Sequence, residues 1–222
     1  QYLYTKNEIY KKILNEYKAI EYGFFNEDNS PFENLNQGIS FAVHLSPAVV
    51  SQIEEEPTKT YFQHYRTTNS FIDSLEERLV LAIIGEGYNA AAVPASQSVE
   101  GYYGIYPHKT AALRAGLGYI GKSALFISKK YGPYVRLGTV FTNADLNGKA
   151  CIQKDECKDC RICSEKCPAM AISGKAFCEG DTREDIFDAR ACSEYMKRNF
   201  QHIGRGSVCG ICMKHCPKGR NI

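Results

Sequence analysis

The spacing of apolar residues predicts two amphipathic helices in the first half of the chain. The first covers residues 5–20, where apolar side chains recur three or four positions apart and Thr5 with Glu8 fits a capping box. The second covers about residues 61–84. Its apolar face carries Phe71, Leu75, Leu79 and Ile83.

Four other apolar stretches predict β-strands, and short helices lie between them. The dipeptide Ser46-Pro47 opens a helix that ends by Pro57, and residues 109–115 form another that ends at Gly116. Strands interleaved with helices predict an α+β fold whose larger part is an α/β layer domain. The predicted strands are 39–45, 88–95, 124–128 and 134–142.

Turn signals predict how the later part of the chain is organised. Residues 129–133, Lys-Lys-Tyr-Gly-Pro, suit a hairpin that pairs the last two predicted strands with each other. A polar stretch at residues 143–149 then marks a domain boundary. We therefore expect an α/β domain over residues 1–148 and a smaller domain over residues 149–222.

Charge and hydropathy limit the classes of partner. The chain has 27 basic and 25 acidic residues, a formal net charge of +2, which gives no electrostatic reason to expect nucleic-acid or membrane binding. No apolar run approaches the roughly 20 residues that span a bilayer. Residues 1–12 lack the basic-then-apolar pattern of a signal peptide. We expect a cytoplasmic protein.

The distribution of the cysteines changes this picture. All ten lie between residues 151 and 222, and the rest of the chain has none. A disulfide scaffold would be expected to cross-link the whole of a small secreted chain, so this one-sided distribution favours metal ligands in a reducing compartment.

Two ordered cysteine motifs predict a pair of [4Fe–4S] clusters. The first has the spacing Cys-x2-Cys-x2-Cys-x3-Cys-Pro and starts at Cys157; the second, Cys-x2-Cys-x3-Cys-Pro, starts at Cys209. In such motifs three cysteines wrap one cubane and the cysteine before proline ligates the other cluster. Crossing the motifs assigns Cys157, Cys160, Cys163 and Cys216 to cluster one. It assigns Cys167, Cys192, Cys209 and Cys212 to cluster two.

Zinc is the alternative, because two Cys-x2-Cys pairs make a tetrahedral four-thiolate site. That reading leaves four further cysteines and both Cys-Pro dipeptides without a role, so we favour the clusters. Of the two remaining cysteines, Cys178 is predicted to be a small buried side chain and Cys151 an inert thiol. The five histidines are scattered, and each is predicted to be a packing or surface residue, although His215 has a position from which it could tune a cluster sulfur.

A glycine-rich segment, residues 115–123 (Ala-Gly-Leu-Gly-Tyr-Ile-Gly-Lys-Ser), precedes the predicted hairpin and the cysteine motifs. Together they resemble the epoxyqueuosine reductase family and the related reductive dehalogenases, most clearly over residues 93–221. The Ala-Arg-x-Cys segment that ends at Cys192 fits the isolated cysteine of that family. The resemblance implies a nitroreductase-like α/β domain that holds cobalamin, followed by a ferredoxin-like domain that supplies it with electrons.

The resemblance also implies a set of corrinoid-binding residues. Glycine suits close approach to a large flat cofactor, but a helix C-cap followed by a tight turn needs glycine as well. The cofactor-binding residues implied are Gly116, Gly118, Tyr119, Gly121, Ser123, Phe126 and Leu137.

Two departures from the family pattern shape the functional expectation. The tRNA-modifying members carry a helical-repeat extension after the last cysteine, whereas this sequence stops at Ile222. They also carry a catalytic aspartate where alignment places either Gly104 or Tyr102 here. Reductive dehalogenases use a tyrosine as proton donor, so the resemblance makes Tyr102 and Tyr106 the candidate catalytic residues.

These patterns predict an iron–sulfur oxidoreductase linked to a corrinoid. A low-potential donor of the ferredoxin or flavodoxin type would reduce the clusters, and the clusters would reduce cobalamin bound to the α/β domain or to a partner corrinoid protein. One alternative is an electron-transfer module with two clusters and no corrinoid. The other is a tRNA epoxyqueuosine reductase without the extension.

Overall fold

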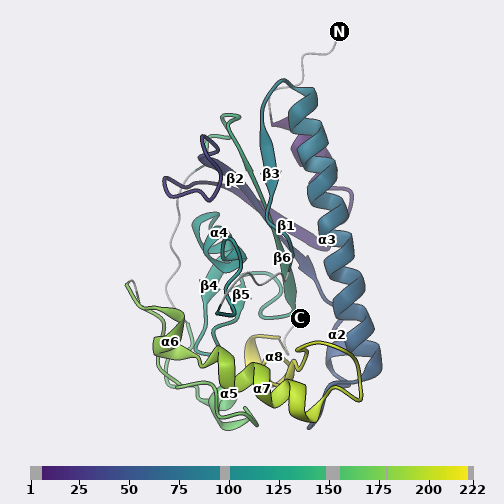
Figure 1. Ribbon diagram of the computed structural model, residues 1–222, viewed down its shortest axis with the longest axis vertical. Coiled ribbons are helices and arrows are strands. Elements are labelled where there is room, and N and C mark those ends of the chain that lie inside the picture. Colours follow the sequence, from purple (N-terminus) through teal and green to yellow (C-terminus); the bar gives the residue numbers. More distant parts are fainter. Residues whose placement is uncertain (1–6, 96–100, 149–155, 179, 220–222) are drawn as a thin grey trace. The chain divides into compact units, whose positions relative to one another are not determined.

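The computed structural model of the protein describes residues 7–95, 101–148, 156–178 and 180–219 (Figure 1). These residues form two compact units, each assembled from segments that are distant in the sequence. The first unit takes the described parts of Gln1–His44, Thr68–Leu117 and Arg136–Ile152. The second takes those of Leu45–Thr67, Gly118–Val135 and Gln153–Ile222.

The first unit is built on a four-stranded sheet with the strand order β1-β2-β6-β3. Strands β1 and β2 form an antiparallel pair in which Ile20 faces Val43, and β3 pairs antiparallel with β6 so that Ala91 faces Phe141. The strands are β1 (Ile20–Asn26), β2 (Gln37–His44), β3 (Ala90–Ala92) and β6 (Val135–Thr142).

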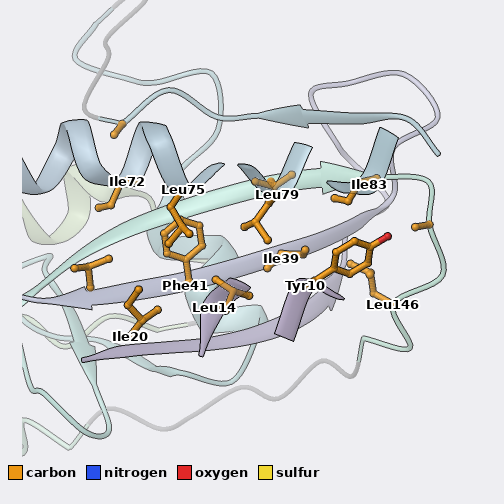
Figure 2. Packing of buried hydrophobic residues seen from close by; sticks show 14 residues of the cluster. Tyr10, Leu14, Ile20, Ile39, Phe41, Ile72, Leu75, Leu79, Ile83 and Leu146 are labelled. Carbon is orange, nitrogen blue, oxygen red and sulfur yellow. The ribbon is translucent and has the colours of Figure 1, made fainter. Parts of the chain in front are cut away.

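Helices cover both faces of this sheet. On one face α1 (Glu8–Leu14) and the part of α3 (Lys59–Gly85) that lies in this unit pack on β1, β2 and β6, as Figure 2 shows for Leu75, Leu79 and Phe41. On the other face α4 (His108–Arg114) contributes Ala111 to a second apolar cluster. That cluster contains Phe25, Leu35, Val93, Tyr106, Ala111 and Phe141. Alternate residues of each strand serve opposite faces, which is the period expected of a sheet buried on both sides.

The second unit consists of short elements around the cysteine segments. A two-stranded antiparallel sheet pairs β4 (Gly118–Ile120) with β5 (Phe126–Ser128). The helices are α2 (Pro47–Val50), α5 (Ile162–Glu165), α6 (Arg183–Ile186), α7 (Ala189–Asn199) and α8 (Ile211–His215), followed by a 3-10 turn over Pro217–Gly219. Its apolar core brings together Leu45, Val50, Ile53, Tyr61, Tyr134, Phe200, Val208, Ile211 and Met213.

The mixed α and β fold and most of the predicted elements are confirmed. The first helix is shorter than predicted, because the chain turns at residues 17–20 and enters β1, a strand that helical spacing concealed. The helix starts after Asn7, whose side chain bonds to the Leu146 carbonyl oxygen (3.2 Å) and does not cap the helix. Thr5, the predicted cap, lies outside the described residues.

The predicted hairpin between residues 124–128 and 134–142 is wrong. Strand β5 pairs with β4, and β6 lies between β2 and β3 in the other sheet. Ser128 and Gly132 do exchange backbone hydrogen bonds of 2.8 and 3.0 Å, but the ladder stops there. After that turn the carbonyl oxygen of Tyr134 accepts from the Leu45 amide (2.8 Å), so the chain leaves β5.

The division into two units also differs from the predicted boundary near residue 148. Residues 45–67 and 118–135 group with the cysteine segments, although they precede that boundary. A polar linker marks a boundary between consecutive segments only. These two stretches join the second unit through side-chain packing with residues far along the chain, which a linker does not reveal.

The first unit buries polar groups between α3, α4 and β6. Glu76 is 1% exposed, and its carboxyl accepts a hydrogen bond from the Thr139 backbone amide (2.7 Å). Burial raises the pKa of Glu76 to about 9. His108 lies with Nδ1 2.9 Å from Thr139 Oγ1 and Nε2 3.3 Å from the Pro94 carbonyl oxygen, and burial lowers its pKa to about 4. Both side chains are therefore neutral at pH 7, as a buried site requires.

Replacing Glu76 should stabilise the protein at neutral and alkaline pH. The folded-state pKa of Glu76 is raised, so the unfolded chain loses this proton first and stability falls as pH rises from about 5 towards 9. Glu76→Gln removes that penalty, and its advantage in unfolding free energy should grow by at most about 1.4 kcal/mol per pH unit. Urea unfolding at pH 5 to 8 measures this. Glu77→Gln, at an exposed neighbour on α3, is the control, and a Glu76→Gln effect independent of pH would contradict the prediction.

Candidate metal centre

Eight cysteines lie on loops and short helices of the second unit. Each is a free, partly buried thiol. Cys163 and Cys212 lie in α5 and α8, Cys192 lies in α7, and the other five lie in the adjoining turns. The eight are Cys157, Cys160, Cys163, Cys167, Cys192, Cys209, Cys212 and Cys216.

The four thiols assigned by sequence to cluster two influence one another in every pairwise combination. Burial raises the pKa of Cys192 to about 12, and Cys209 and Cys167 raise it further. Burial also raises the pKa of Cys209 to about 11, with Cys167 adding to the effect. The pKa of Cys212 is raised by burial and then by Cys209, Cys192 and Cys167. Such mutual effects require proximity, so α7, α8 and the loop after α5 bring these four side chains together.

The thiols assigned to cluster one form a second group. Burial raises the pKa of Cys163, and the neighbouring Cys216 and Cys160 raise it as well. Cys216 responds to burial first and also to Cys160. Cys157 joins them through Lys218, whose ammonium lies close enough to both Cys157 and Cys216 for each to raise its pKa.

One interaction connects the two groups, because Cys163 is among the residues that raise the pKa of Cys212. In the described part of the chain, no three His, Cys, Asp or Glu side chains are gathered tightly enough to hold a single metal ion. A cubane distributes its thiolates over different irons, so its ligands lie farther apart than those of one ion.

Backbone amides point at several of these sulfurs. The Ala171 amide donates to Cys167 Sγ (3.4 Å), and the Ile211 amide donates to Cys209. The Lys218 and Gly219 amides, at the 3-10 turn after the Cys-Pro dipeptide, donate to Cys216. Such bonds favour the thiolate form and are among the features that set the potential of an iron–sulfur cluster.

Gly132 shows why an upstream loop belongs to this unit. Its φ of +54° is in the left-handed region, and a Cβ there would lie 2.3 Å from the Lys218 carbonyl oxygen. The Tyr134 ring packs on Gly219, and its hydroxyl donates to the Lys214 carbonyl oxygen (3.3 Å). The Tyr-Gly-Pro-Tyr loop at residues 131–134 therefore packs directly against the second cysteine motif.

The residues implied as corrinoid-binding are mostly packed against protein. Tyr119, Ser123 and Phe126 are buried. A Cβ on Gly118 would lie 2.0 Å from the Ile127 carbonyl oxygen, because β4 and β5 approach closely there. A Cβ on Gly121 would lie 3.0 Å from the Ile127 side chain. Protein packing thus explains both glycines.

The other two implied residues belong to the first unit. Gly116 ends α4 with a φ of +74°, and the Leu117 amide bonds back to the Ala112 carbonyl oxygen (3.0 Å). This is the helix C-cap that the sequence allowed as the alternative. Leu137 is a half-buried residue of β6. A corrinoid role for these residues stays a prediction.

The two candidate catalytic tyrosines differ in their surroundings. Tyr102 is 41% exposed and has a φ of +64°. Tyr106 is buried, and its hydroxyl donates to the carboxylate of Glu27, which pairs with Arg114 (2.7 Å). Burial and then the Glu27 hydrogen bond raise the pKa of Tyr106, which makes it a weaker proton donor.

The two remaining cysteines have different outcomes. Cys178 is exposed, so the prediction that it is buried is wrong; the Asp181 carboxylate accepts a bond from its backbone amide (2.8 Å) in a surface loop. Cys151 lies outside the described residues.

Sequence reasoning missed three side chains that the fold places in polar interactions. Glu27 and Arg114 are 87 positions apart and meet only in the folded chain. Lys122 is in the glycine-rich segment but received no role, and the structure places its ammonium beside the first cysteine motif. The position of Lys122 within the glycine-rich segment was the one sequence feature that could have pointed to it.

Comparisons with known proteins agree with the resemblance drawn from the motifs, although no family model matches the chain. The chain is 27% identical over 195 residues to an epoxyqueuosine reductase of Lactococcus garvieae, covering 81% of this chain and 52% of that protein. Against the Synechocystis sp. epoxyqueuosine reductase it is 41% identical over 127 residues, or 51% of this chain and 40% of that protein. The tetrachloroethene reductive dehalogenase of Sulfurospirillum multivorans is 30% identical over 131 residues, which cover 53% of this chain and 26% of that protein.

The chain spans 26% to 52% of the length of these three relatives. Solved structures share its fold. A catabolic reductive dehalogenase in complex with 3-bromo-4-hydroxybenzoic acid matches 96% of this chain and 32% of its own with a TM-score of 0.75 and 19% identity. The epoxyqueuosine reductase of Streptococcus thermophilus matches 97% of this chain and 65% of its own with a TM-score of 0.57 and 21% identity.

Two of our expectations about partners are affected. An epoxyqueuosine reductase with a bound tRNA stem loop matches 96% of this chain and 64% of its own with a TM-score of 0.56 and 17% identity, which leaves the expectation of no nucleic-acid partner without support. No helix of the described residues combines the length and apolarity needed to cross a membrane.

Proposed function

Because the chain is related in sequence to epoxyqueuosine reductases and reductive dehalogenases, we propose that it is an iron–sulfur oxidoreductase that carries two [4Fe–4S] clusters. The observation that supports this most is the grouping of eight thiols into two neighbouring sets. Cluster one takes Cys157, Cys160, Cys163 and Cys216. Cluster two takes Cys167, Cys192, Cys209 and Cys212.

The chemistry of the donor set fits these groups. Burial raises the pKa values of Cys192, Cys209 and Cys212. Iron that replaces their protons would bind these side chains as thiolates, which is the form that ligates a metal. Backbone amides directed at Cys167, Cys209 and Cys216 would stabilise the thiolates of a bound cluster.

Cys163 lies close enough to Cys212 to raise its pKa, so the two clusters would be neighbours and an electron could pass between them. A low-potential ferredoxin or flavodoxin is the donor in this proposal.

A corrinoid is the proposed electron acceptor. Support comes from the resemblance and from a solved relative described in terms of B12-dependent dehalogenation, whose fold matches with a TM-score of 0.74. A corrinoid supplies a cobalt centre that accepts low-potential electrons and reacts with the substrate. In this proposal the clusters of this chain would supply electrons to the corrinoid. The residues that would contact the corrinoid are Gly116, Gly118, Tyr119, Gly121, Ser123, Phe126 and Leu137. Since protein packing accounts for Gly118 and Gly121, an electron-transfer module without a corrinoid remains the alternative.

Single cysteine variants should separate the two clusters. Anaerobic reconstitution of the wild type should give about eight iron and eight sulfide per chain. Cys212→Ser should remove cluster two and Cys216→Ser cluster one, although the two residues are four positions apart. Each variant should retain about four iron, with different electron paramagnetic resonance signals.

Cys178→Ser is the matched control for these variants, because Cys178 is an exposed thiol of the same unit. It should retain all the iron. A wild type that saturates with one zinc ion, or a Cys178 variant that loses a cluster, would refute the assignment.

Titration with cob(II)alamin tests the corrinoid part of the proposal. None of the five histidines lies between residues 116 and 137, so we expect a base-off form without a nitrogen ligand from that segment. Anaerobic titration followed by absorption and electron paramagnetic resonance should show base-off cob(II)alamin with micromolar or tighter binding. No spectral change would favour the module without corrinoid. Gly118 is a poor site for a test variant, because a side chain there would break the β4–β5 pairing.

A tRNA epoxyqueuosine reductase activity is the second candidate, and the curated relatives of that name favour it. Against it, the sequence has no carboxylate at either position aligned with the family's catalytic aspartate, Tyr102 and Gly104. We therefore expect the reconstituted chain not to convert epoxyqueuosine in tRNA to queuosine. The assay is mass spectrometry of the tRNA nucleosides after reduction, and turnover would promote this candidate over the corrinoid-linked reductase.

A further inference from the structure

Lys122 is a buried cation that none of the roles described so far uses. It lies in the turn between β4 and β5, and it is only 8% exposed. Its ammonium donates to the carbonyl oxygens of Lys158 and Cys160, the latter at 3.3 Å. Both carbonyls belong to the loop that carries the first cysteine motif.

These bonds fix the shape of that loop. The Cys160 amide bonds to the Cys157 carbonyl oxygen (2.9 Å), which closes a tight turn, and Lys158 within it has a φ of +46°. The bonds from Lys122 to two carbonyl oxygens therefore anchor the loop to the β4–β5 turn, in addition to the hydrogen bonds within the loop itself. The preceding Gly121 lies beside the first thiol, since a Cβ there would be in van der Waals contact with Cys157 Sγ at 3.4 Å.

Within the part of the chain that the structure describes, Lys122 forms no salt bridge with an acidic side chain, and its ammonium donates to carbonyl oxygens. A buried ammonium balanced only by dipoles is costly. By contrast, Lys218, another lysine close to this thiol set, is exposed and pairs with Glu156 (2.7 Å). A cubane with four thiolates is an anion whose negative charge increases on reduction, so it would supply the missing countercharge.

We propose that Lys122 is a positioning residue for the cluster held by Cys157, Cys160, Cys163 and Cys216, and that its ammonium raises the reduction potential of that cluster. This inference rests on the proposed two-cluster function. Its physical basis is that a nearby cation in a poorly solvated site stabilises the reduced, more negative form over the oxidised form.

The test compares Lys122→Met with Lys129→Met in the full chain after anaerobic reconstitution. Lys129 is an exposed lysine after β5, so the control makes the same change in charge away from the loop. Redox titrations followed by electron paramagnetic resonance give the potential of each cluster, and iron release to a chelator gives its stability. The Cys212→Ser and Cys216→Ser variants identify which signal belongs to which cluster.

In Lys122→Met, the cluster that is absent from Cys216→Ser should shift to a more negative potential. It should also release its iron about tenfold faster, as expected for the loss of charged hydrogen bonds. The other cluster and Lys129→Met should behave as the wild type does. Lys122→Arg retains the charge and should keep the potential closer to the wild-type value than Lys122→Met does.

Unchanged potentials and release rates in a folded Lys122→Met that holds both clusters would overturn the inference, as would a shift confined to the other cluster. If Lys122→Met fails to fold, Lys122→Gln, which keeps one donor group without the charge, takes its place under the same criteria. A wild type that binds no clusters would instead refute the two-cluster function, so the two failures are distinguishable.

Discussion

The burial of eight thiols in one small unit is the constraint on which the second half of this molecule depends. Burial raises the pKa of Cys192 and that of Cys212, and the neighbouring Cys209 and Cys167 raise both further. The apolar core of this unit joins Phe200, Val208, Ile211 and Met213 from the cysteine segments to residues from far upstream, such as Ile53, Tyr61 and Tyr134. A metal cluster bound by these cysteines would contribute folding free energy as well as redox chemistry.

The first unit solves a different problem. Its sheet is covered on both faces, so polar side chains near β6 and α4 must be neutral or paired. Glu76 is neutral through its raised pKa, whereas Glu27 pairs with Arg114 and accepts a hydrogen bond from the Tyr106 hydroxyl. The same pairing engages the hydroxyl proton of Tyr106. Tyr102 is exposed and is the better placed of the two to meet a ligand from solvent.

The glycine-rich turn at residues 115–123 has a structural role as well as the cofactor-binding role implied by its resemblance. Its resemblance to a cofactor-lining segment implied that the glycines face a corrinoid. In the folded chain Gly118 lets β5 approach β4, and Gly121 with Lys122 contacts the first cysteine motif. The glycine-rich turn is thus tied to the cysteine loops, which gives a physical reason for the turn and the cysteines to occur together in this chain.

The sequence by itself determined the features that depend on local spacing. The periodicity of Leu75, Leu79 and Ile83 predicted α3, and the order and spacing of the cysteines predicted two sets of four ligands. It could not determine the partner of β5, because the Ser128–Gly132 turn is compatible with either outcome and β4 competes for the same edge. Nor could it join Glu27 to Arg114 or Lys122 to the Cys157–Cys160 loop. Those contacts connect residues 36 to 87 positions apart, and only tertiary packing decides which distant polar groups share a buried site.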